Sequence, residues 1–178
     1  MLLITKFIFN KLLKWKVTGH TDLLKKCVII AAPHTHWHDL FIAIMARKVI
    51  KQEINFIGKK ELFKFPLGYF FRLMGGKPVE RGSKSNNVKR IADVFKNNDL
   101  LRLALSPEGT RKKVDKWKTG FYYIAKEANV PIISASLNFK DKEIKISEPY
   151  YITGDIEKDI KFLKLFFKGI EGKISEFS

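Results

Sequence analysis

The chain has 178 residues, which fits one domain, and its hydrophobic content of 46% is that of an ordinary globular protein. A single cysteine, Cys27, excludes an internal disulfide and a two-cysteine metal motif, and it fits a reducing cytoplasm. The net charge of +16 indicates an anionic partner, which can be nucleic acid, an anionic membrane surface or a phosphorylated small molecule, unless the lysines are only solvated.

Residues 2–16 predict an amphipathic helix. Lys6, Asn10 and Lys14 recur at every fourth position, while Leu, Phe and Trp side chains occupy much of the remaining surface. Such a helix can lie in a lipid interface or pack on the core of its own domain, and the sequence leaves both open. No run reaches the roughly 18–20 apolar residues of a membrane-spanning helix, and no small-residue cleavage site follows. We therefore expect no transmembrane helix and no signal peptide.

The rest of the chain alternates predicted strands and helices. The apolar run 27–32 is typical of a strand buried on both faces, and residues 38–50 show helical spacing. Further strands are predicted at 53–57, 78–80, 100–105, 132–138 and 143–147. Further helices are predicted at 59–65, 67–74, 88–97 and 121–128, with an amphipathic C-terminal helix over 155–174. The alternation predicts an α/β fold with a mainly parallel central sheet flanked by helices, with functional groups beyond the carboxyl ends of the strands.

A histidine-rich turn, Pro33-His34-Thr35-His36-Trp37-His38-Asp39, follows the first buried strand. In one interpretation, His34 is a base and Asp39 orients it. Imidazole titrates near neutral pH, and a carboxylate on one ring nitrogen fixes the tautomer that can accept a proton at the other. The H-x4-D spacing allows the two side chains to fold back on each other across the turn.

A second interpretation makes the same turn a metal site. His34, His36 and His38 with Asp39 resemble the H-x-H-x-D-H motif of metallo-β-lactamase-like hydrolases with the last two letters exchanged. These side chains can bind zinc, but the chain has no histidine after His38 to complete that family's ligand set. In a third interpretation, the histidines are only polar residues of a turn.

Two more polar segments also follow predicted strands. Ser106-Pro107-Glu108-Gly109-Thr110-Arg111 combines a glycine that permits a tight turn with a guanidinium that can bind phosphate oxygens. We expect Glu108 to accept hydrogen bonds from backbone amides or a hydroxyl and so to order this loop. The segment Gly75–Gly82 places Arg81 at another strand end, where it could contact the same phosphate; a solvated loop and a surface ion pair are the alternatives.

Together these segments resemble the glycerolipid acyltransferases, and in particular the lysophosphatidic acid acyltransferases. Four blocks occur in the family's order over about residues 30–135: His34 with Asp39, Gly75 through Arg81, Glu108-Gly109-Thr110-Arg111, and Val130-Pro131-Ile132-Ile133. Pro33 and His36 stand where the family often has Asn and Ser.

The resemblance implies a single acyltransferase domain over residues 1–178, with a catalytic α/β core at 27–150, in phospholipid biosynthesis. It implies transfer of a fatty acyl group from acyl-CoA or acyl carrier protein to the hydroxyl of a lysophospholipid, with 1-acylglycerol-3-phosphate as the first expected acceptor. His34 and Asp39 would be catalytic. The substrate-binding residues would be Arg81, Glu108, Gly109, Thr110 and Arg111.

We expect no cofactor and no metal for this activity, and a peripheral location at an anionic membrane surface on the cytoplasmic side. The positive charge then matches the acceptor, the acyl donor and the membrane, without a nucleic-acid partner. A zinc-dependent hydrolase built on His34, His36 and His38 and a basic nucleic-acid-binding domain are the alternative functions.

Overall fold

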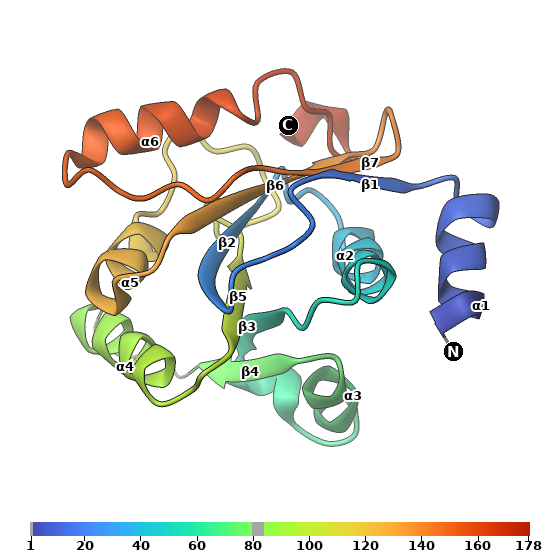
Figure 1. Cartoon of the computed structure of the whole chain (residues 1–178). Helices are drawn as coiled ribbons and strands as arrows, with labels where there is room; N and C mark the ends of the chain where they lie inside the picture. The colour runs from blue at the N-terminus through green and yellow to red at the C-terminus, as the bar shows by residue number, and fades with distance from the viewer. Residues whose placement is uncertain (1, 80–83) are drawn as a thin grey trace.

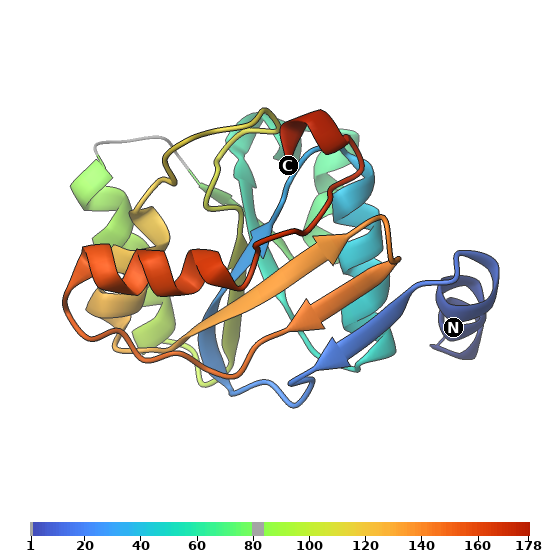
Figure 2. The same cartoon turned by 90° about the horizontal axis from the view of Figure 1, so that it is seen from above.

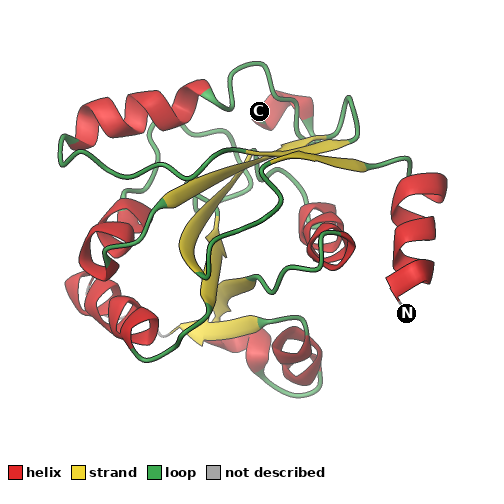
Figure 3. Cartoon of the chain, in the orientation of Figure 1, coloured by secondary structure: helices red, strands yellow, loops and turns green. Residues whose placement is uncertain are grey.

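The structure, a computed structural model, describes residues 2–79 and 84–178, which form a seven-stranded sheet with helices on both faces (Figures 1 and 3). In sheet order the strands are β1 (Lys16–Gly19), β7 (Glu143–Ile146), β6 (Ile132–Asn138), β2 (Lys26–Ala32), β5 (Leu101–Leu105), β3 (Asn55–Lys59) and β4 (Gly76–Val79). The strands from β6 to β4 are parallel, whereas β7 is antiparallel to β6 and β1 pairs in parallel with β7.

Helices cover both faces of this sheet. Their bounds are α1 (Leu2–Phe7), continued by a π-helical turn η1 (Ile8–Leu12), α2 (His38–Val49), the 3₁₀ turn η2 (Lys60–Phe63), α3 (Leu67–Leu73), α4 (Lys84–Lys96), α5 (Gly120–Ala128), α6 (Ile156–Leu165) and the 3₁₀ turn η3 (Ser175–Phe177). Figure 1 shows α4 and α5 on one face and α1, α2 and α3 on the other. The expected fold class, a mainly parallel sheet flanked by helices, is confirmed.

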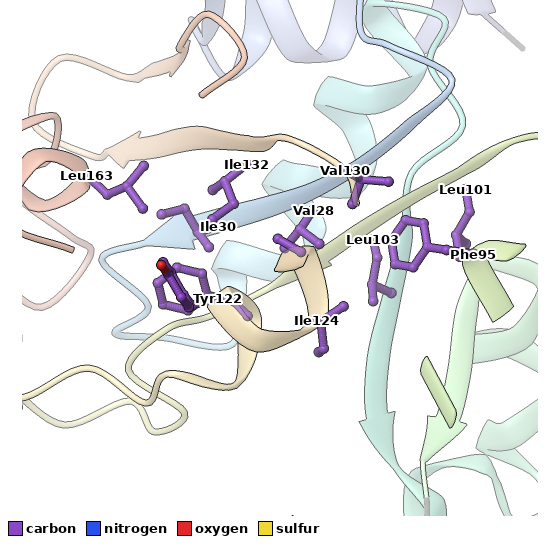
Figure 4. Packing of buried hydrophobic residues seen from close by; sticks show 12 residues of the cluster. Val28, Ile30, Phe95, Leu101, Leu103, Tyr122, Ile124, Val130, Ile132 and Leu163 are labelled. Carbon is purple, nitrogen blue, oxygen red and sulfur yellow. The ribbon is translucent and has the colours of Figure 1, made fainter. Parts of the chain in front are cut away.

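Strand β2 separates two hydrophobic cores, as its continuous apolar sequence predicts. Val28 and Ile30 point into the core beneath α4, α5 and α6, which Figure 4 shows from close by. Cys27 and Ile29 alternate with them and point into the core beneath α2. Successive side chains of a strand face opposite sides, so a strand buried on both faces must be apolar at every position. This double burial fixes the place where β2 ends and the histidine-rich turn begins.

The N-terminal helix packs on the core of its own domain through one side, while contact with a lipid interface stays a prediction. It ends at Leu12, and its side chain Phe9 is fully buried in the core beneath α2, together with Trp15. Leu3 and Phe7 on its other side are exposed. The predicted helix over 2–16 is therefore too long: Lys16 already belongs to β1, a strand that was not predicted. No helix of the described residues has the length and apolar character needed to cross a bilayer.

The C-terminal helix is also shorter than the predicted range 155–174. It ends at Leu165, after which the bonds from Phe167 N–H to the Lys164 carbonyl and from Lys168 N–H to the Leu165 carbonyl tighten the chain into turns. Gly169 then adopts a positive φ of 78°, which ends any helical path. The remaining residues run back across the sheet, and Figure 2 shows η3 at the edge where β2 and β5 end.

Candidate active site

The turn between β2 and α2 is organised around one buried carboxylate. Asp39 lies in the first turn of α2, where a negative charge is favoured by the helix dipole. Its Oδ2 atom accepts hydrogen bonds from the backbone N–H groups of Thr35, at 2.8 Å, and His36, at 2.9 Å. Its Oδ1 atom is buried, with no hydrogen-bond partner among residues 2–79 and 84–178. The aspartate therefore shapes the backbone of the turn as well as facing the imidazole.

The imidazole of His34 is held by the same carboxylate. Its Nδ1 atom lies 2.9 Å from Asp39 Oδ2. Because an ionised carboxylate only accepts hydrogen bonds, this contact assigns the proton to Nδ1 and leaves the lone pair on Nε2. The His34 side chain is 30% exposed whereas that of Asp39 is 4% exposed, so solvent or a ligand can reach the ring but not its partner. The pair has the geometry of a general base with an orienting group.

The loop after β5 joins this turn through Glu108. One carboxylate oxygen of Glu108, Oε2, accepts a hydrogen bond from the backbone N–H of His34 at 2.7 Å and another from Ser106 Oγ at 3.4 Å. These are the two kinds of donor expected for Glu108. Burial raises the pKa of this carboxyl, and the His34 amide opposes the rise. The contact ties the strand ends of β2 and β5 together next to the imidazole.

The next three residues of the loop are more exposed. Gly109 has a φ of 63°, and a side chain there would collide with Lys118, whose Nζ donates to the Gly109 carbonyl at 3.3 Å. Thr110 accepts a hydrogen bond from the Lys112 backbone N–H at 3.4 Å. Arg111 is exposed and close enough for its charge to contribute to the lowered pKa of His36. Arg81 lies outside the described residues, so its place beside the same site stays a prediction.

The other two histidines of the turn contact each other. The His38 backbone N–H donates to His36 Nδ1 at 3.3 Å, and the two rings pack edge to face at 4.5 Å. Burial, followed by the charge of His38, lowers the pKa of His36. Among the described residues, no group of three or more His, Cys, Asp or Glu side chains is arranged to hold a metal ion. This part of the chain therefore gives no support to a zinc site.

The C-terminal segment is a part of the site that the sequence did not reveal. The backbone N–H of Ile174 donates to the buried hydroxyl of Thr35 at 3.1 Å, across 139 positions of the sequence. Gly172 packs so closely on Thr35 that a Cβ atom there would lie 2.6 Å from its methyl group. Lys173 between them adds a positive charge near His36. These residues reach the turn only through the tertiary fold, and no sequence motif marks them.

The arrangement supplies a proton acceptor, His34 Nε2, beside a loop with an exposed guanidinium. It lies at the edge where parallel strands end, which is where α/β sheets commonly place their ligands. Such a site can remove a proton from a hydroxyl whose own molecule carries an anionic group.

Comparisons with known proteins identify the family and the fold of the chain. A family model described as Acyltransferase matches residues 14–138, well over half of the chain. The crystal structure of the 1-acyl-sn-glycerophosphate (LPA) acyltransferase PlsC from Thermotoga maritima is similar with a TM-score of 0.64 and 17% sequence identity, over 94% of this chain and 76% of PlsC. At that identity, the similarity shows a shared fold. No curated protein matches the chain significantly. The resemblance seen in the sequence motifs is confirmed by the family match, and the chain belongs to the acyltransferase family.

Proposed function

We propose that this protein transfers a fatty acyl group from an acyl thioester to the free hydroxyl of a lysophospholipid, with 1-acylglycerol-3-phosphate as the first acceptor to test. The observation that carries the proposal is the His34–Asp39 contact, which leaves Nε2 of a partly exposed imidazole able to accept a proton. Membership of the acyltransferase family supports the reaction class. The structurally similar PlsC is described as an acyltransferase acting on 1-acyl-sn-glycerophosphate, which supports the choice of acceptor.

In the proposed reaction, His34 Nε2 takes the proton of the acceptor hydroxyl as its oxygen attacks the thioester carbonyl carbon. The tetrahedral intermediate collapses with cleavage of the carbon–sulfur bond, and the imidazolium returns its proton to the departing thiolate. Asp39 keeps the tautomer and stabilises the imidazolium that forms between the two steps. The family resemblance implies direct transfer without an acyl-enzyme. Cys27 is a poor acyl carrier, because it is fully buried in the core and burial raises its pKa to about 12.

We assign the acceptor's phosphate to Arg111 and to Arg81, which lies outside the described residues. Glu108 positions the His34 backbone, while Gly109 and Thr110 shape the loop that carries Arg111. A phosphate close to the reacting hydroxyl would then lie within the positive field of this loop. In the cell we place the protein at the cytoplasmic surface of an anionic membrane, where its lysolipid acceptors reside.

The test is an acyl-transfer assay over a panel of lysophospholipids, each with acyl-CoA and with acyl carrier protein as donor. His34→Ala is expected to lower kcat by about a hundredfold or more, because the reaction then lacks its general base. The matched control is His20→Ala, since His20 Nδ1 also faces a carboxylate, Glu148 Oε2, at 3.0 Å, but with the carboxylate 80% exposed. That control should keep wild-type kcat.

Both variants should retain the wild-type circular dichroism spectrum. Wild-type turnover in the His34→Ala protein would reject the mechanism. Absence of transfer from every donor to every acceptor in the wild-type protein would reject the proposed function.

A further inference from the structure

A groove with a volume of about 420 Å³ lies beside the candidate active site. Its lining includes Pro33 and Glu108, the residues that flank and hold the His34 backbone. Its walls are the loop around Val114 and Trp117, the helix α6 and the chain that follows α6. The groove is therefore lined both by residues next to His34 and by α6 with the chain that follows it.

The floor of this groove is apolar and its rim is positive. Apolar lining side chains come from all three walls: Val114, Trp117, Leu165, Phe167, Ile170 and Phe177. The Trp117 and Phe167 rings pack edge to face at 5.4 Å, which gives the floor a rigid aromatic part.

Four lysines form the rim, namely Lys113, Lys161, Lys164 and Lys168. Lys161, Lys164 and Lys168 are spaced by three and four residues along α6 and the turn that follows it, so they form one row. Among the described side chains that line the groove, that of Glu108 is the only acidic one, and it contacts the His34 backbone. Lys164 also places its ammonium over the Trp117 ring, 5.5 Å from the centroid.

A ligand that fits this groove has one end at the reaction centre, an apolar or amide-bearing body and anionic groups farther out. The proposed acceptor does not match, because its phosphate lies next to its reacting hydroxyl and Arg111 does not line the groove. The acyl thioester donor does match. Its phosphopantetheine arm begins at the reacting sulfur, continues through amides and a dimethyl group, and ends in phosphate.

We propose that the groove between α6 and the 113–117 loop binds the phosphopantetheine arm of the acyl donor, with the lysine row pairing with its phosphate groups. The proposal rests on the proposed acyl-transfer function and assigns it a second substrate site. Acyl-CoA and acyl carrier protein share this arm, and separate donor assays distinguish them. Phosphates at a partly exposed lysine rim gain most of their binding from charge, so binding should weaken at high salt.

The deciding variant is Lys161→Glu/Lys168→Glu, because both side chains are exposed and line the rim. Its matched control is Lys89→Glu/Lys126→Glu, which makes the same change in net charge on α4 and α5, away from the groove. The rim variant should raise the donor KM about tenfold and leave the acceptor KM within about twofold. The control should leave both values within about twofold. A Lys161→Gln/Lys168→Gln protein repeats the test if the charge reversal impairs folding.

A binding measurement without acceptor separates this proposal from the proposed function. CoA and holo-acyl carrier protein are titrated into the wild-type protein and both variants by calorimetry, so no turnover is required. Loss of CoA or carrier binding in the rim variant alone supports the groove, even if no acceptor is ever acylated. A larger effect with one of the two probes identifies the source of the arm.

Three results would overturn the groove while leaving the acyl-transfer function intact. The first is transfer activity with an unchanged donor KM in the rim variant. The second is an acceptor KM that rises in place of the donor KM. The third is active wild-type protein that binds neither CoA nor holo-acyl carrier protein more tightly than the rim variant does.

Discussion

At the scale of single residues, Glu108 links the loop after β5 to the backbone of His34. Its Oε2 atom accepts the backbone N–H of His34 at 2.7 Å, so it fixes the main chain of the catalytic candidate without touching the imidazole–aspartate contact. Burial raises its pKa above the ordinary 4.5, with the His34 amide as the main opposing influence. The folded protein therefore favours the neutral form of the Glu108 carboxyl more than the unfolded chain does.

This conflict predicts opposite stability effects for two substitutions. Glu108→Gln keeps a carbonyl acceptor for the His34 N–H but removes the charge. Because the folded pKa is raised, wild-type protein loses stability as the pH rises from 4.5 through the folded value, and the glutamine variant does not. The variant's advantage should thus grow from acidic to neutral pH. Glu108→Ala leaves the amide unpaired and should lower the free energy of unfolding by about 1–2 kcal/mol.

Urea unfolding of the three proteins at acidic and at neutral pH checks both statements. A glutamine variant whose stability follows the wild-type pH curve would show that the Glu108 charge is not disfavoured by its surroundings. An alanine variant as stable as wild type would show that the His34 amide finds water or another acceptor.

The geometry of the histidine-rich turn was predictable from its sequence because all of its parts are local. His34, Asp39 and the amides of Thr35 and His36 lie within six consecutive positions, where a short turn brings them together. Glu108 could be placed near them only by assuming that strands β2 and β5 are parallel neighbours, as they are. The contact from Ile174 to Thr35 could not be predicted, because the returning chain shows no apolar period or motif that specifies where it docks.

At the scale of elements, Asp159 fixes α6 and hence the proposed donor groove. This fully buried carboxylate accepts hydrogen bonds from the hydroxyl of Tyr122 on α5 at 3.0 Å, from that of Tyr150 at 2.6 Å, and from that of Thr153 at 2.8 Å. Burial acts to raise the pKa of the carboxyl, but these bonds together outweigh it and hold the pKa below 3.8. One aspartate thus joins α6 to α5 and to the chain that precedes it.

Asp159→Ala should lower the free energy of unfolding by about 3 kcal/mol at neutral pH, because it leaves several buried donors without an acceptor. The wild-type contribution is present above 3.8, the ordinary pKa of the group, and is lost as the pH falls through the lower folded value. The gap between the two proteins should therefore close in strong acid. Chemical unfolding across this pH range measures it.

The matched control is Asp155→Ala on the same helix. Asp155 is the N-cap residue: it accepts the Lys158 backbone N–H at 3.2 Å and forms an exposed ion pair with the Lys158 ammonium, also at 3.2 Å, so its loss should cost about 1 kcal/mol. Equal losses for the two variants would show that the buried network contributes no more than a surface cap.

The errors in the predicted elements have a common physical origin. Strand β1, Lys16–Gly19, is short and polar, and its ladder partner β7 is more than a hundred residues away, so no local pattern marks it. The C-terminal helix was extended too far because Phe167 and Ile170 continue its apolar spacing while belonging to turns. By contrast, β2 was predicted correctly because a strand buried on both faces has apolar residues at every position. A strand with one exposed face does not have such a continuous apolar run.

At the scale of the whole molecule, charge and exposed apolar side chains occur together. The chain carries a net charge of +16. Leu3 is 81% exposed and Phe7 58% exposed on α1, and Phe65 is 97% exposed just before α3. Figure 1 shows both helices on the same side of the sheet. A positive net charge together with exposed apolar side chains is typical of proteins that bind anionic lipid interfaces reversibly.

We therefore predict binding to vesicles that contain anionic lipid and weak binding to vesicles of zwitterionic lipid alone. Long-range attraction is screened over about 10 Å at 0.1 M salt and over shorter distances above it, so binding to anionic vesicles should fall at least about tenfold between low and high salt. Leu3→Gln/Phe7→Gln should weaken binding at every salt concentration, because it removes apolar insertion and not charge. Leu100→Gln/Tyr151→Gln, also at exposed positions but in loops distant in sequence from α1, is the control.

Vesicle sedimentation over a salt series distinguishes the two contributions. If charge attracts the protein and α1 inserts, the α1 variant binds more weakly than wild type by the same factor at every salt concentration. The control variant then binds as wild type does. If α1 only packs on the domain, as the buried Phe9 does, the α1 variant and the control give the same curve. Equal binding to zwitterionic and anionic vesicles, or binding that does not respond to salt, would show that the net charge does not drive membrane binding.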